Sequence, residues 1–174
     1  MAPRDTARKS GGPEDSARRA ALSLLAGVLA EKQTIADQLT GPEIAALSAP
    51  DRARAQRLAL TVLRNLGRAD TVLKPLLRKA PPDDILLLLR LAVVEMLMDR
   101  AAAHGVVNSA VALTRAAGPR AEPFTGMVNA VLSRVAETPP EVFAALPPPP
   151  LAPWLRRRLI EAWGKPAVQA IEAV

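Results

Sequence analysis

The sequence predicts an all-α protein, and three observations support this. The chain is 49% hydrophobic but only 2% aromatic, and it is rich in Ala and Leu, so strand formers are scarce. Apolar residues recur at helical spacing in several segments that lie between Pro and Gly breaks. One segment, Ile85–Met98, is apolar nearly all round, which is typical of a central helix packed on several sides. With 174 residues, we expect one medium-sized domain with appendages.

The chain begins with a polar stretch, residues 1–14, whose Gly, Pro and charged residues predict a disordered basic arm. Asp15 or Ser16 can then cap the first helix. Its apolar residues follow the spacing of one buried helix face: Ala21, Leu24, Leu25, Val28 and Leu29. A short segment around Ile35–Leu39 precedes a break at Gly41-Pro42.

The next helix begins after Ser48, because Pro50 and Asp51 suit the first helical turn. It continues to Leu66, and Gly67 ends or bends it. A further short helix is expected around Val72–Leu77, where Pro75 leaves the boundary open.

The second half contains three predicted helices. Asp83 or Asp84 caps the apolar segment Ile85–Met98. Val107, Ala110 and Val111 give the following helix its stripe, and Gly118-Pro119 ends it. The third helix has the clearest amphipathic pattern: Phe124, Met127, Val128, Val131, Leu132 and Val135.

The C-terminal part begins with a proline-rich linker, residues 138–153, and residues 139–153 hold seven of the 17 prolines. Such a segment is expected to be stiff and extended. Two short helices follow, Trp154–Trp163 and Ala167–Val174, with Gly164 between them. The last helix is still periodic at Val174 and has no cap, so we expect the natural protein to continue.

The net charge of +6 and a pI of about 10.7 suit an anionic partner such as RNA or a membrane surface. A compositional bias toward Arg and Ala is the alternative explanation. The chain has no cysteine, which excludes disulfides, a thiolate nucleophile and a Cys-ligated metal. No secretory signal is present, and the longest apolar stretch is too short and too charged to span a bilayer. We therefore expect a cytoplasmic protein without membrane attachment.

Five segments, in their order and spacing, resemble the NusB superfamily over roughly residues 15–137. They are ARRAALSLL (17–25), DRARAQRLALTVLRNL (51–66), LLRLAVVEML (88–97), VVNSAVAL (106–113) and GMVNAVL (126–132). The resemblance implies an all-α bundle of two small helical subdomains. It also implies RNA binding, since stand-alone NusB is an antitermination factor that binds RNA with a ribosomal-protein partner.

The segment LAPWLRRRLIEAWGKPAVQAIEA (151–173) is similar to the connector of 16S ribosomal RNA (cytosine-5) methyltransferases of the Fmu/Sun type. That resemblance implies a NusB-like N-terminal domain that helps to hold ribosomal RNA. A C-terminal domain of the same protein would bind S-adenosylmethionine and use a cysteine nucleophile. Cytosine C5 methylation needs a thiolate that attacks C6, so this cysteine-free chain is expected to be non-catalytic and without a cofactor. An antitermination factor and a purely structural interaction domain remain alternatives.

The residues expected to contact RNA are all basic. In NusB-like proteins a basic N-terminal stretch touches RNA, and Arg18 and Arg19 stand at the matching position. The arm supplies further cations: Arg4, Arg8 and Lys9. In the helix that begins near residue 51, Arg57, Arg64 and Arg68 share one angular sector and extend the basic surface. The alternative for each set is an ordinary solvated face.

The other polar residues are expected to be structural. Asn108 and Asn129 match family positions, and we interpret them as buried residues that bond to a neighbouring backbone or helix end. His104 lacks the partners for a metal or acid–base site and is expected in a cap or turn. Glu95 should pair with an arginine, for which Arg90 is poorly placed.

The C-terminal cations Arg156, Arg157 and Arg158 cannot all face one way, so one or two can touch RNA or the expected catalytic domain. Trp154 and Trp163 are expected to pack against that domain or against the bundle. Because aromatic residues are nearly absent, the sequence predicts no base-stacking platform, and RNA contact should rely on phosphates and shape. The sequence leaves the oligomeric state open.

Overall fold

The computed structural model describes residues 13–147 and 150–172. In these two ranges all regular structure is helical, which confirms the predicted fold class. The α-helices and two 3-10 turns are α1 (Pro13–Leu29), α2 (Ile35–Leu39), α3 (Pro42–Ala45), α4 (Ala49–Arg64), α5 (Leu66–Leu73), η1 (Lys74–Leu76), α6 (Asp83–Leu97), α7 (Ala103–Ala116), η2 (Glu122–Phe124), α8 (Thr125–Val135), α9 (Pro140–Ala145) and α10 (Pro153–Glu172). No helix in the described residues is long and apolar enough to cross a membrane.

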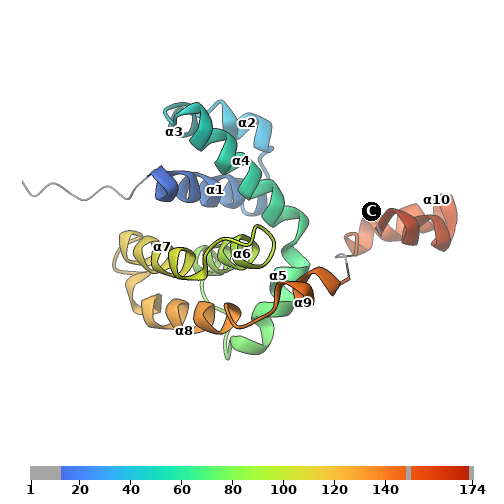
Figure 1. The fold of residues 1–174 in the computed structure, drawn as a ribbon. Coiled ribbons are helices and arrows are strands. Elements are labelled where there is room, and N and C mark those ends of the chain that lie inside the picture. The colour runs from blue at the N-terminus through green and yellow to red at the C-terminus, as the bar shows by residue number, and fades with distance from the viewer. Residues whose placement is uncertain (1–12, 148–149, 173–174) are drawn as a thin grey trace, which may run out of the picture.

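The bundle has two small helical groups that share one core. α1 packs along α4, with the short α2 and α3 at one end of this pair, and α6, α7 and α8 form the second group (Figure 1). α6 contacts α1, α4, α5, α7, α8 and α9, so it lies at the centre of the molecule. This arrangement explains why the 85–98 segment is apolar on every side: almost every residue of α6 from Ile85 onward is buried.

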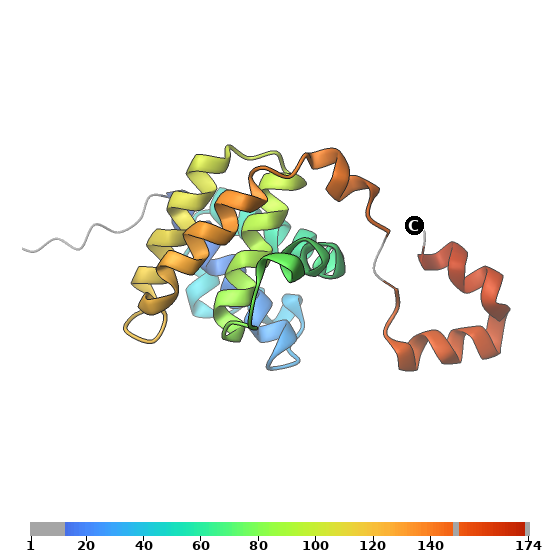
Figure 2. The ribbon, with the colours of Figure 1, turned by 90° about the horizontal axis from the view of Figure 1, so that it is seen from below.

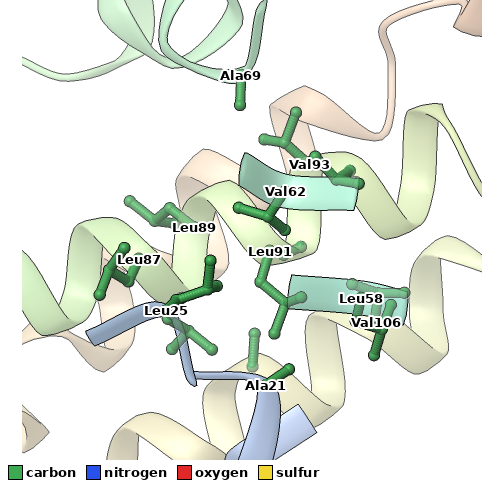
Figure 3. Close-up of a cluster of buried hydrophobic side chains, with 14 of the residues drawn as sticks. Ala21, Leu25, Leu58, Val62, Ala69, Leu87, Leu89, Leu91, Val93 and Val106 are labelled. Carbon is green, nitrogen blue, oxygen red and sulfur yellow. The ribbon is translucent and has the colours of Figure 1, made fainter. Parts of the chain in front are cut away.

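The core consists of aliphatic side chains contributed by both groups. Leu89, Leu91 and Val93 of α6 lie among residues of α1, α4 and α7 (Figure 3). The stripe predicted for the first helix is confirmed at Ala21, Leu24 and Leu25, which are fully buried, whereas Val28 and Leu29 are only partly buried. Aliphatic burial of this kind is the main favourable term in folding, at roughly 25 cal/mol per Å² of apolar surface.

The helix boundaries differ from the predictions at four places. The short helix expected around Val72–Leu77 lies earlier, as α5 from Leu66 to Leu73, and the 3-10 turn η1 follows it. α1 already begins at Pro13, before the expected caps. α4 ends at Arg64 rather than near Gly67, because Asn65 leaves the helical conformation at φ −115° and ψ 15°. Asn65 is buried, and its amide donates to the Thr61 carbonyl. The N-cap of α6 is Pro82, while the Asp84 carboxylate accepts from the adjacent Ile85 N–H. Ser48 caps α4 as predicted, accepting from the Asp51 N–H.

The proline-rich region is not simply an extended linker. Residues 140–145 form α9, and Phe143 on this helix is only 1% exposed and belongs to the core. Proline suits the first turn of a helix, so Pro140 starts α9 instead of preventing it. The expectation of an extended chain from residue 138 is therefore wrong over α9, because one aromatic side chain returns to the bundle.

The last helix is bent into two segments, as the sequence predicts. Gly164 has φ 79° and ψ 159°, a conformation that is essentially restricted to glycine, and it divides α10. Val168 in the second segment is fully buried although α10 lies beyond α9 and apart from α1–α4 (Figure 2). The Glu172 carboxylate accepts from the Leu151 N–H and from Arg156 Nε, at 3.1 and 2.8 Å, which ties the end of α10 to its beginning.

Candidate nucleic-acid interface

Arg18 lies inside the bundle and not on its surface. Its side chain is 6% exposed, and its Nε donates to Glu95 Oε2 at 2.8 Å. Its Nη1 donates to Ser109 Oγ at 3.2 Å, and the Ser109 hydroxyl donates to the Asp15 carboxylate. Arg18 is therefore wrong as an expected RNA contact, because folding has placed its guanidinium among partners from three helices.

Glu95 completes this buried polar cluster. Its side chain is 3% exposed, and Oε1 lies 3.6 Å from Arg54 Nη2 while Oε2 binds Arg18. The expectation that Glu95 pairs with an arginine is confirmed. Arg90 instead binds Asp70 through two hydrogen bonds of 2.7 and 2.8 Å. Two cations and two carboxylates make the cluster neutral, which is how buried charges are tolerated.

Apart from Arg68, the other predicted RNA contacts fall into three classes. Arg4, Arg8 and Lys9 lie outside the described residues. Arg19 and Arg64 are exposed, and their guanidinium groups have no hydrogen bond or ion pair within the described chain. Arg57 is 60% exposed but lies 3.2 Å from Asp99 Oδ2, so its charge is partly compensated.

Arg68 has a structural role. The break at Asn65 places it on α5 rather than on α4, so it does not share one helix face with Arg57 and Arg64. Its Nε donates to the Leu146 carbonyl at 3.0 Å, and its Nη1 donates to Asn65 Oδ1 at 3.2 Å. Arg68 thus holds the end of α9 against α5, although its side chain remains only half-buried.

Three exposed cations on the same stretch were not singled out from the sequence: Lys74, Arg78 and Lys79. Residues 64–79 contain five basic residues, and their single acid, Asp70, is bound by Arg90. The cluster KPLLRK at 74–79 was the available signal. We call the four exposed residues of this stretch the basic stretch; they are Arg64, Lys74, Arg78 and Lys79.

Asn108 and Asn129 are both exposed, so the interpretation as buried residues is wrong. The buried positions of α7 are Val106, Ser109 and Ala110, which turns Asn108 outward. His104 is exposed within the first turn of α7 and caps nothing. Among the described residues, no group of three or more His, Asp and Glu side chains is placed to hold a metal ion.

A hollow of about 320 Å³ lies between the end of α1 and the start of α6. Its lining is mainly aliphatic, with two exposed carboxylates, Asp83 and Asp84, and with Arg90, whose charge is compensated by Asp70. A smaller hollow of about 130 Å³ shares Ala26, Asp84 and Leu87 with it and extends to Leu113 of α7. The two hollows thus adjoin at these shared residues, and we call them together the α1–α6 groove; their lining is mainly apolar and includes Asp83 and Asp84.

The comparisons with known proteins agree with this architecture. The model of the NusB family matches residues 15–137, which includes α1 through α8 except the first two residues of α1. A solved structure of NusB from T. maritima superposes with a TM-score of 0.62 at 20% identity, covering 79% of this chain and 100% of that chain. Among curated proteins, none matches the sequence. The chain belongs to the NusB family.

Proposed function

We propose that this chain is a non-catalytic RNA-binding domain that helps to hold ribosomal RNA for an S-adenosylmethionine-dependent 16S rRNA cytosine-5 methyltransferase. The observation that carries RNA binding is a NusB-family bundle with exposed cations that no acid compensates, Arg19 and the basic stretch. Phosphate neutralisation by such cations supplies most of the affinity of proteins for nucleic acids. The similarity of residues 151–173 to a methyltransferase connector supports the narrower assignment.

The chemistry of the residues decides which functions we assign to this chain and which to a catalytic domain of the same protein. Attack on cytosine C6 needs a thiolate, and the chain contains no cysteine. A nucleotide-like cofactor such as S-adenosylmethionine is commonly bound at a Gly-rich turn between a strand and a helix, and the described residues contain no strand. We therefore assign the nucleophile and the cofactor to a C-terminal catalytic domain of the same protein, and the RNA contacts to this one.

The test is a titration of a fluorescent 16S rRNA fragment with the purified chain, followed by anisotropy at several salt concentrations. We expect the affinity to fall steeply with salt, and each removed phosphate contact to lower the salt slope by roughly 0.9. Arg19→Glu and a Lys74→Glu/Lys79→Glu variant should weaken binding. Arg134→Glu on the exposed face of α8 changes the net charge by the same amount as Arg19→Glu and by half as much as the double variant, and it serves as the control.

Undetectable RNA binding at low salt would refute the proposal and leave the purely structural role. Equal losses of RNA affinity per reversed charge in the control and in the two test variants would show that only net charge matters. In that case neither Arg19 nor the basic stretch would be an RNA contact.

A second function, that of an antitermination factor which binds RNA with a ribosomal-protein partner, is favoured by the α1–α6 groove. A mainly apolar lining that includes Asp83 and Asp84 suits a basic protein segment that inserts an aliphatic side chain. Calorimetric titration with individually purified small-subunit ribosomal proteins tests this function. Asp83→Lys/Asp84→Lys should abolish binding of the partner while RNA binding remains. If none of these proteins binds the unmodified chain, this function is excluded.

A further inference from the structure

We infer that the first turns of α10 form a stacking site for one unpaired RNA base, with Trp154 as the platform. The inference rests on the proposed RNA-binding function and adds a contact that the scarcity of aromatic residues argued against. The indole of Trp154 is 63% exposed, although a Trp side chain in a folded protein is usually well buried. An exposed aromatic face beside cations is the arrangement by which proteins bind single-stranded nucleic acid.

The cations stand at the right helical positions. Arg157 and Arg158 follow Trp154 by three and four residues, so all three side chains share one side of the helix. Both guanidinium groups are exposed and have no partner in the described part of the chain. Glu161 lies one turn further on and is exposed, which leaves two positive charges against one negative charge on this side.

The backbone around Trp154 is fixed by contacts within residues 150–172, which we call the C-terminal unit. Arg156 on the neighbouring side of the helix binds Glu172, which also accepts from the Leu151 N–H just before Trp154. An open hollow of about 680 Å³ follows the platform, and its charged lining residues are Arg156, Arg157, Glu161 and Glu172. Because Arg156 compensates Glu172, a nucleotide whose base stacks on Trp154 has room for its sugar in this hollow, with its phosphate next to Arg157. Because its backbone is already fixed, this segment loses little conformational freedom on binding.

The ligand class follows from the geometry of the contact. Stacking needs an accessible base face, which an unpaired nucleotide offers and the interior of a duplex does not. The site carries no set of buried donors and acceptors to read base edges, so the binding should tolerate any base. We therefore assign it to a single-stranded element of RNA.

The experiment uses tryptophan fluorescence, because the chain has only two tryptophans. Trp163→Phe leaves Trp154 as the sole fluorophore, and the variant is titrated with a single-stranded RNA octamer and with the blunt-ended duplex of the same octamer. We expect the single strand to quench the fluorescence and the duplex to quench it much less. Trp154→Ala in the otherwise natural chain should weaken octamer binding roughly 5- to 150-fold. Trp163→Ala, which removes an equally exposed indole, is the matched control.

Absence of quenching while the octamer still binds by anisotropy would overturn the stacking site and leave the proposed function intact. The basic stretch can also be replaced in the Trp163→Phe chain. If quenching by the octamer persists and the affinity for the rRNA fragment does not fall, the result supports stacking on Trp154 and counts against the basic stretch as an RNA contact. Equal losses in the two Trp→Ala variants would overturn the assignment to Trp154. A fluorescence change that depends on protein concentration without RNA would overturn RNA as the occupant, in favour of a second copy of the chain.

Discussion

At the scale of single residues, Arg18 and Arg19 show that consecutive arginines on one helix can lie in opposite environments, one buried and one exposed. Adjacent helical positions differ by about 100°, so one of two consecutive arginines on an amphipathic helix can face the core while the other faces solvent. Leu24 and Leu25 define the buried face, and Arg18 lies on the edge of that face where α7 and α6 approach. The same local sequence therefore supplies one structural cation and one that is exposed.

The buried cluster predicts the effect of removing one charge. Glu95→Gln keeps the shape of the side chain but leaves two arginines facing a neutral amide inside the bundle. We expect a loss of about 3–5 kcal/mol in the free energy of unfolding, measured by urea denaturation. Asp99→Asn removes the partner of the exposed Arg57 and should cost less than about 1 kcal/mol. Similar losses in both variants would show that the cluster is not effectively buried.

The sequence could indicate that Glu95 needs an arginine, because an acid inside an apolar helix requires compensation. It could not identify the partner, since Arg18 lies 77 residues away and its pairing depends on the packing of α1 against α6. For the same reason the exposure of Asn108 and Asn129 was missed. Apolar neighbours in sequence do not decide the rotation of a helix; the packing of the whole helix does.

At the scale of elements, periodicity located α1, α4, α6, α7 and α8, and the errors, which include the position of α5, lie at breaks without a strong local signal. Asn65 divides α4 from α5 through a side-chain bond to Thr61, and no Pro marks the position. α9 was missed because prolines on both sides of a short helix resemble those of an extended linker. Gly164 was recognised because glycine is the residue that a break with positive φ requires.

The contact of Glu172 with Arg156 and the Leu151 N–H, which we call the latch of α10, should depend on pH. The hydrogen bond from Arg156, with a further one from the Leu151 N–H, lowers the pKa of Glu172 below its ordinary value of 4.5. A carboxylate with a lowered pKa stabilises the folded unit above its ordinary pKa, and this contribution is lost as the pH falls through the lowered value. We therefore expect the latch to be intact at neutral pH and to open in acid below 4.5.

Trp154 fluorescence of the Trp163→Phe chain, recorded from neutral to strongly acidic pH, measures the opening of this latch. Glu172→Gln in the same background cannot ionise, so the corresponding change should be absent. An identical pH curve in both variants would mean that another group is responsible.

At the scale of the whole molecule, the chain consists of a bundle that ends with α9 and a C-terminal unit that stands apart from it. α10 makes only sparse contacts with the helices of the bundle, whereas α9 inserts Phe143 into the core (Figure 2). The family match ends at residue 137, just before α9. The helical bundle is therefore slightly longer than the segment that matches the NusB family. It ends near Leu146, whose carbonyl accepts a hydrogen bond from Arg68.

This boundary predicts that two truncations only a few residues apart have different effects. A chain that ends at residue 147 keeps Phe143 and the Leu146 carbonyl, so its urea midpoint, followed by circular dichroism, should match that of the bundle in the intact chain. A chain that ends at residue 138 loses the aromatic side chain from the core and should lose roughly 3–5 kcal/mol, as for a Phe→Ala cavity. Phe143→Ala in the intact chain separates the side chain from the helix and should show most of the same loss. If the longer truncation product is also destabilised by several kcal/mol, α10 contributes to the core after all, and the stacking surface assigned to it would be part of the bundle.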